Sequence, residues 1–359
     1  MKKLEQEQVR SMWNVSGGLA NANRWLDESP NRDVEVEYLA KPTDEWGRKV
    51  DDVETAFAPD YDTEEYSNPA LVMLNMAEFS MMAEAVGVAP PWEQQAQAEQ
   101  PLAGTRWLDV GCGTGRIALY GASLGSEVTA FDQTAAYLEV TASKANRLPE
   151  GVREPDLQVM PVEAALRYWK NNSLEKYDYI SAMFAVINHC KDWPRALQEM
   201  SVMLAEDGKV VLSMYGSPEA AVFEELREGL PYAPAILVRR VEGGLLLGDS
   251  VEDVLPAKFP YPKDVVRSLE NDGLGVQELI PLLSVTSLYP RDPSARNIEA
   301  FLEAVSRQYG SEMSDFLAAY RDDPEQLLMA SFRADYQIPV EMIDKAAYYG
   351  IVATKQELS

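Results

Sequence analysis

Cysteine is scarce in this 359-residue sequence, which contains two, Cys112 and Cys190. They lie far apart and form no Cys-x-x-Cys pair, so the sequence indicates neither a disulfide framework nor a zinc cage. Such a protein suits a reducing compartment, and we expect it in the cytoplasm. An export signal is also not predicted, because Glu5 and Glu7 stand where a signal peptide needs an apolar stretch.

Positive charge is scarce as well. Lys and Arg total 32 while Asp and Glu total 58, which gives a formal net charge of −26. This average charge repels a phosphate backbone, so we expect no nucleic-acid partner. The longest apolar run, residues 71–77, is interrupted by Asn75 and is far shorter than the roughly 20 residues that span a bilayer. We therefore expect no membrane partner.

From residue 101 onward, short apolar runs alternate with helical segments, a pattern typical of a parallel sheet covered on both faces. We expect strands over residues 105–110, 127–131, 157–162, 177–184, 209–214, 275–282 and 348–355. Helices are expected over residues 68–86, 115–124, 133–148, 194–204 and 262–271, and over much of 295–347. Residues 236–241 and 245–248 flank a Gly-Gly pair with the chemistry of a hairpin turn.

These patterns divide the chain into a core and additions to it. The core covers residues 101–215 and continues in 255–289. We expect an N-terminal helical cap in residues 1–100, an insertion with a β-hairpin in 216–254, a helical insertion in 290–345, and the last core strand with the tail in 346–359.

Three glycines, Gly111, Gly113 and Gly115, follow the first core strand and precede a helix. Glycine lets bare backbone approach a ligand, and the helix start offers free N–H groups. The dinucleotide fingerprint needs its third glycine where Arg116 stands, which disfavours NAD. A P-loop needs Gly-Lys-Ser/Thr at its end, and this loop has none, which excludes ATP bound in that way.

The phrase W-L-D-V-G-C-G-T-G over residues 107–115 resembles the first motif of class I S-adenosylmethionine-dependent methyltransferases of the small-molecule type. The next strand ends in Asp132, where that family holds the ribose hydroxyls with a carboxylate. The resemblance covers residues 101–215 and, more loosely, 260–289 and 346–356. It implies an α/β, Rossmann-like fold with a seven-stranded, mostly parallel sheet, a helical N-terminal cap and a helical insertion.

The resemblance also implies S-adenosyl-L-methionine as cofactor, no metal, and transfer of a methyl group to a small-molecule acceptor. The acceptor atom, O, N, S or C, stays open. The implied cofactor-binding residues are Asp109, Gly111, Cys112, Gly113, Gly115, Asp132, Gln133, Val162, Glu163 and Phe184. Asp109 either contacts the cofactor's amino group through water or stabilises the loop, while Cys112 packs between two glycines. Methylation of protein or RNA, and a non-catalytic sensor of the cofactor, remain the alternatives.

His189 is the only histidine of the chain and the candidate catalytic residue. Its unperturbed pKa near 6.5 lets it remove a proton from an acceptor at neutral pH. The alternative is a loop histidine that hydrogen-bonds its neighbours.

An aromatic cluster and the segments outside the core are candidates for the acceptor pocket. The cluster either lines that pocket or packs a helical cap; it comprises Trp13, Trp25, Tyr61 and Tyr66. Ligands of open α/β sheets bind at the carboxyl ends of the strands. We therefore expect residues 1–100, 216–254 and 295–345 to roof the site together. The alternatives are a homodimer interface or packing on the outer helices.

Overall fold

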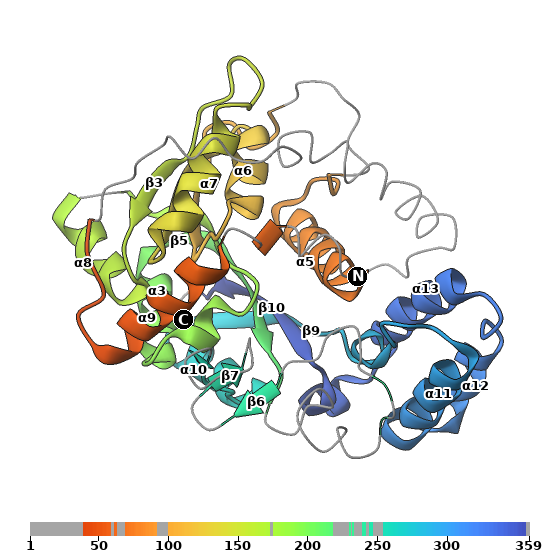
Figure 1. The fold of residues 1–359 in the computed structure, drawn as a ribbon. Coiled ribbons are helices and arrows are strands. Elements are labelled where there is room, and N and C mark those ends of the chain that lie inside the picture. The colour runs from red at the N-terminus through yellow and green to blue at the C-terminus, as the bar shows by residue number, and fades with distance from the viewer. Residues whose placement is uncertain are drawn as a thin grey trace.

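The computed structural model describes residues 39–58, 61–62, 69–91, 100–172, 175–217, 230, 232, 239–241, 244–246 and 254–356. Trp13, Trp25 and Tyr66 of the aromatic cluster lie outside the described residues. The described part is built around one large twisted sheet with helices on both sides (Figure 1). Within it, no helix combines the length and the apolar character that crossing a bilayer requires.

The sheet has seven strands in the order β3-β2-β1-β4-β5-β10-β9. Strands β1 to β5 run parallel, and β10 runs antiparallel to both of its neighbours. The strands are β1 Arg106–Val110, β2 Glu127–Asp132, β3 Asp156–Val159, β4 Tyr177–Ala182, β5 Leu204–Tyr215, β9 Leu274–Leu282 and β10 Tyr348–Lys355. This strand order and the single reversed strand confirm the predicted Rossmann-like class of fold.

Two apolar layers cover the sheet. The layer on one face packs against α5 Pro69–Val86, α6 Arg116–Ser123 and α7 Ala135–Ala145. On the other face, the layer packs against α8 Val162–Asn172, α9 Trp193–Met203 and α10 Pro262–Asn271. Side chains along β10 alternate between the two layers, as the pleat of a strand requires.

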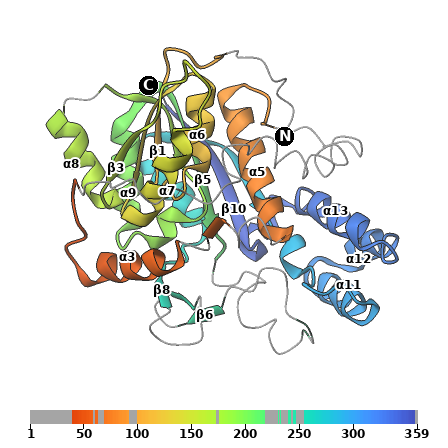
Figure 2. The same ribbon diagram turned by 45° about the horizontal axis from the view of Figure 1, so that its top comes forward.

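The N-terminal cap contributes α3, Glu45–Phe57, which begins where the Asp44 side chain accepts a hydrogen bond from the Gly47 amide at 2.8 Å. Helix α3 crosses the end of the sheet next to α7 (Figures 1 and 2). The helical insertion forms α11 Ala295–Tyr309, α12 Ser311–Ala318 and α13 Pro324–Asp335 beyond strand β9. Short 3₁₀ turns complete the chain: η1 Val186–His189, η4 Thr286–Leu288 and η5 Val340–Lys345.

A small antiparallel sheet confirms the predicted hairpin and adds a strand to it. Strand β6, Arg239–Val241, pairs with β7, Gly244–Leu246, which pairs with β8, Val254–Pro256. Strand β8 was not predicted, because three residues are too few to show a period.

Some predicted elements have different bounds. Strand β3 ends at Val159 instead of residue 162, because Val162 already begins α8, a helix that we did not predict. Strand β5 begins at Leu204 instead of residue 209 and runs through Glu206-Asp207-Gly208, residues that are typical of a turn. Its register with β4 shifts between Tyr177 and Tyr179, so these turn-forming residues are accommodated as an irregularity within the strand.

Candidate active site

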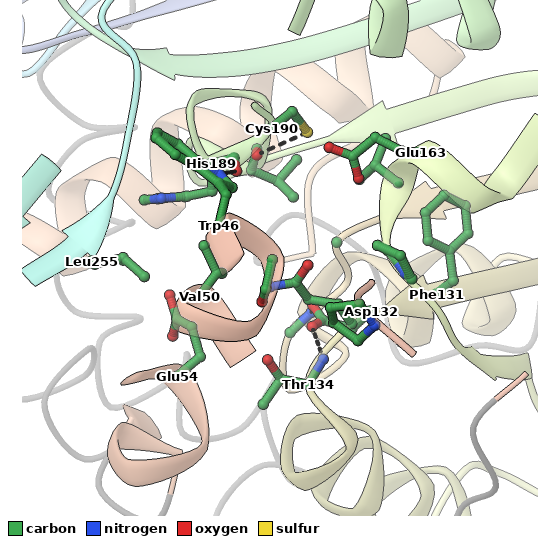
Figure 3. A pocket seen from close by; sticks show the side chains of 18 of the residues that line it. Trp46, Val50, Glu54, Phe131, Asp132, Thr134, Glu163, His189, Cys190 and Leu255 are labelled. Carbon is green, nitrogen blue, oxygen red and sulfur yellow. Dashed lines mark hydrogen bonds between the residues drawn. The ribbon is translucent and has the colours of Figure 1, made fainter. Parts of the chain in front are cut away.

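A cavity of about 310 Å³ lies at the carboxyl ends of the central strands, beneath α3 (Figure 3). Its walls come from the glycine loop after β1, the end of β2, the start of α8, the turn after β4, and α3. Eight of the predicted site residues line it: Gly111, Gly113, Asp132, Gln133, Val162, Glu163, Phe184 and His189. A smaller adjoining hollow is lined by Asp109 and Cys112 and shares the Gly111, Gly113 and Phe184 walls.

The glycine loop follows β1 with each of its glycines at positive φ. A Cβ on Gly111, whose φ is +64°, would lie 1.9 Å from Cγ2 of Val186, so the turn after β4 requires glycine there. A Cβ on Gly113, whose φ is +53°, would meet nothing within 4 Å. Gly113 therefore presents bare backbone to the open space of both hollows, as a close-lying ligand requires.

Gly115 has a different role. It caps α6 at φ +88°, and a Cβ there would lie 2.4 Å from Cγ2 of Thr141 on α7. It lines neither hollow. The structure thus gives this glycine a packing reason, and its predicted contact with a cofactor stays a prediction.

Asp132 ends β2 and anchors the glycine loop. Its Oδ2 accepts a hydrogen bond from the Gly113 amide at 3.0 Å, and its Oδ1 accepts one from the Thr134 amide at 2.9 Å. Burial raises the pKa of this carboxyl to about 6, against the effect of the two amides. Each carboxylate oxygen keeps a further lone pair, so Asp132 can still accept bonds from a diol at the cavity wall.

Asp109 occupies the smaller hollow and ends a buried chain of hydrogen bonds. The Trp107 indole N–H donates to the Ser181 hydroxyl at 2.8 Å, which donates to Asp109 Oδ1 at 2.6 Å. Burial raises the pKa of Asp109 to about 7, although Ser181 and the nearby Arg116 charge favour its ionised form. Burial also raises the pKa of the neighbouring Cys112 thiol well above its usual value, so this thiol stays neutral.

Phe184 lies in the turn after β4 with φ of 56°, a backbone conformation that is rare for a bulky residue. Its N–H donates to the Ser213 hydroxyl at 2.7 Å and to Oε1 of Glu78 at 3.0 Å. Ala185 follows with φ of 64°. Strain of this kind is found at binding sites, where the surrounding structure holds it.

His189 lies at the cavity wall, at the end of η1. Its Nδ1 is 2.8 Å from the Pro256 carbonyl oxygen, which can only accept, so Nδ1 carries the proton of the neutral ring. Burial lowers the pKa of His189 to about 4, despite this hydrogen bond. The ring is therefore neutral at physiological pH, with Nε2 unprotonated. Whether it acts on a substrate stays a prediction.

The cap supplies lining residues that the sequence analysis missed. One face of α3 lines the cavity with residues at helical spacing: Trp46, Val50, Glu54 and Phe57. The Trp46 indole donates to the His189 carbonyl oxygen at 2.6 Å, which fixes α3 to the turn after β4. The intervals of four, four and three residues are the signal that could have revealed this helix.

Two carboxylates from the N-terminal segment contact the binding loops from behind. Glu78 of α5 is fully buried, and its Oε2 accepts from the Arg116 guanidinium at 2.6 Å. Asp62 pairs with the buried Lys144 at 2.7 Å and accepts from the Thr114 hydroxyl at 2.7 Å. These residues position the glycine loop and the turn after β4, although the sequence marked neither as functional.

The prediction that three segments share the roof is met in part. Residues 42–57 and Tyr61 of the aromatic cluster supply much of the described lining, whereas no described residue of 216–254 lines the cavity and Leu255 lies just past that insertion. No described residue of 295–345 lines either hollow, and α11 to α13 lie beyond β9 (Figures 1 and 2). That part of the prediction is wrong, because the insertion follows the edge strand β9 and lies away from the central strands.

A family model described as a methyltransferase domain matches residues 88–239, which contain the glycine loop, Asp132 and His189. Residues 88–239 therefore form a methyltransferase domain. This confirms the family, the enzyme class and the cofactor that the sequence predicted for this domain.

One curated relative is the Saccharomyces cerevisiae protein named Probable S-adenosylmethionine-dependent methyltransferase CRG1. It is 26% identical over 193 residues, which are 54% of this chain and 60% of the yeast protein. The match therefore spans less than two thirds of that relative.

Solved structures similar to this chain include phospholethanolamine N-methyltransferase 2 of Haemonchus contortus. It has a TM-score of 0.42 and 15% identity over 78% of this chain and 52% of that one. The cyclopropane synthase MmaA2 of Mycobacterium tuberculosis has a TM-score of 0.41 and 13% identity over 78% of this chain and 84% of that one. Since both scores lie below 0.5, the fold assignment rests on the strand order of the chain itself.

Proposed function

We propose that this protein transfers a methyl group from S-adenosylmethionine to a small molecule. The observation that carries the proposal is the cavity beneath α3, whose walls combine the glycine loop with the N-terminal cap. Its volume of about 310 Å³ falls at the lower end of the range for small-molecule sites. A pocket roofed by a helix suits a molecule of metabolite size better than a polymer.

The residues present fit the cofactor. Gly113 offers bare backbone at the junction of the two hollows, and Asp132 offers carboxylate oxygens for a ribose diol. We expect Gln133, Val162 and Glu163 to face the adenine, and Asp109 to face the amino-acid end in the smaller hollow. When bound, S-adenosylmethionine supplies an activated methyl group. The protein then has to orient the acceptor, exclude water and accept the proton that the acceptor loses.

A screen of candidate metabolites with cofactor labelled in its methyl group tests this function. We expect label to appear in at least one small product and the demethylated cofactor to form in equal amount. Tight binding of S-adenosylmethionine with no labelled product from any metabolite would favour a non-catalytic protein instead. Label in protein or RNA would identify a macromolecular acceptor.

A further inference from the structure

Glu54 carries a carboxyl group on the inward face of α3 and has no role in the function proposed above. It lines the main cavity together with Val50 and Trp46, which lie about one and two turns before it (Figure 3). Its Oε2 accepts a hydrogen bond from the Tyr137 hydroxyl of α7. Among the described residues, none donates a hydrogen bond to Oε1. A carboxylate oxygen at this cavity wall can accept a hydrogen bond from a ligand.

The surroundings of Glu54 place it over the middle of the sheet. It shares the cavity walls with Gly111 and Gly113 of the loop after β1 and with Phe184 of the turn after β4. Strands β1 and β4 are neighbours between β2 and β5, and α7, which carries its hydrogen-bond partner Tyr137, follows β2. Burial raises the pKa of Tyr137 and of Tyr215, and the charge of Glu54 adds to both rises.

Aromatic rings line the same part of the cavity. The Tyr61 ring lies edge-on to Tyr137, Phe57 and Phe184, with centroids 5.0, 6.0 and 6.2 Å apart. Aromatic faces and a carboxylate both attract a cation, most strongly where water is excluded. The formal charge of −26 adds a general attraction for cations. An organic ammonium group on an apolar body fits these walls.

We propose that Glu54 binds the ammonium group of an amine acceptor and takes its proton. The inference rests on the proposed function and names the class of its substrate. An ammonium nitrogen has no lone pair, so it must lose a proton before it can attack. The N–H bond breaks, the proton moves to Glu54 Oε1, and the electron pair stays on nitrogen. The nitrogen then forms a bond to the methyl carbon, and the electron pair of the broken S–C bond stays on sulfur.

The protonation behaviour of Glu54 agrees with this role. Burial raises its pKa from 4.5 to about 7, the nearby Asp132 adds to the rise, and the Tyr137 hydrogen bond opposes it. A proton acceptor works best with a pKa near the working pH, and His189, at about 4, is the weaker base. Among the described residues, the ionisable groups around Glu54 include Tyr137, Asp132, Tyr61 and Tyr215, and Asp51 of the same helix acts on Asp132.

Binding of a matched pair of probes to the full chain tests the proposal without turnover. The probes are 2-phenylethylamine and its uncharged counterpart 2-phenylethanol, titrated by calorimetry into protein saturated with S-adenosylhomocysteine. We expect Glu54→Gln, which keeps an acceptor for Tyr137, to weaken amine binding roughly 10- to 150-fold, the range for a hydrogen bond to a charged group. Alcohol binding should stay unchanged. Glu45→Gln, an exposed position on the same helix, is the matched control and should leave both affinities unchanged.

A pH series supplies a second readout. Amine affinity of the unmodified protein should fall as the pH drops through about 7, where Glu54 takes up a proton. The Glu54→Gln variant should lose this dependence. Tyr137→Phe should move the midpoint to higher pH, because the lost hydrogen bond favoured the ionised carboxyl.

Three results would overturn the proposal. The first is an amine affinity that equals the alcohol affinity in the unmodified protein. The second is equal loss of both affinities in Glu54→Gln. The third is a loss of S-adenosylhomocysteine affinity in that variant as large as the loss for the amine, which would place the carboxyl at the cofactor. Failure of the unmodified protein to bind S-adenosylhomocysteine would instead reject the proposed function itself.

Discussion

Replacing Glu78 with Ala should strongly destabilise the protein. The side chain is fully buried, and one of its oxygens pairs with Arg116, whose own side chain is 8% exposed. The other oxygen accepts from the Phe184 amide and the Ser213 hydroxyl. One carboxylate thus joins α5, α6, β5 and the turn after β4.

The magnitude follows mainly from the ion pair. Removing one partner of a buried pair costs about 3–5 kcal/mol, because the other charge stays buried without its counter-charge. The Phe184 amide keeps the Ser213 hydroxyl as acceptor at 2.7 Å, so the loss of its hydrogen bond to Glu78 adds little to the cost. We expect a loss of about 3–5 kcal/mol, a large part of the roughly 5–15 kcal/mol by which domains are stable.

Urea denaturation followed by circular dichroism measures this loss. Glu84→Ala, an exposed position on the same helix, is the control and should change the free energy of unfolding by under about 1 kcal/mol. The double variant Glu78→Met with Arg116→Met should regain most of the loss, because apolar side chains can replace a buried pair. A loss below about 1 kcal/mol in Glu78→Ala would refute the reasoning.

The remaining predictions concern the ligand and the pH. Asp132→Ala should weaken S-adenosylmethionine binding by about 1.5–3 kcal/mol in calorimetry, while NAD binds neither protein; an unchanged affinity would contradict the assignment. Since Glu54 takes the proton in our proposal, His189→Ala should lower turnover less than tenfold, and a fall of roughly 10²–10⁴-fold would assign that role to His189. Burial raises the pKa of Glu54, Asp109 and Asp335 to about 7 and of Asp132 to about 6. Stability from these carboxyls is present at low pH and is lost as the pH rises through 6 to 7. His189 has the opposite effect on stability, because its pKa is lowered to about 4 in the folded protein, but it is a single group. The melting temperature should therefore rise from pH 8 to pH 5.5, and a fall over that interval would show that other groups dominate.

The sequence predicted the core of this fold because the relevant signals are local. Strands β1, β2, β4, β9 and β10 lie within two residues of their expected bounds. Each contains a short apolar run, and β1, β2 and β10 end at or directly before glycine or a polar residue, so the residues themselves carry the evidence. The glycine loop was predicted equally well, because three glycines in one strand-to-helix turn are typical of a ligand-binding loop.

The contacts from the cap could not be predicted in the same way. Glu78 stands in an apolar helix, and its partner Arg116 is 38 positions away, so no local pattern pairs them. Asp62 and Glu54 look like surface acids in a chain with 58 acidic residues. Only the fold shows that Asp62 meets Lys144 and that Glu54 meets Tyr137.

These long-range contacts bear on where the folding unit begins. The family model starts at residue 88, yet the buried cations Arg116 and Lys144 of that domain pair with Glu78 and Asp62, which precede it. Cutting the chain at the family boundary would remove both carboxylates together with α5, whose apolar side chains are buried on the same face of the sheet as α6 and α7. Losing this apolar contact and the two charge pairs costs several kcal/mol, a large part of the roughly 5–15 kcal/mol by which domains are stable. We therefore expect that the matched segment does not fold by itself and that the N-terminal segment, whose helix α3 covers the cavity, also holds the glycine loop in place.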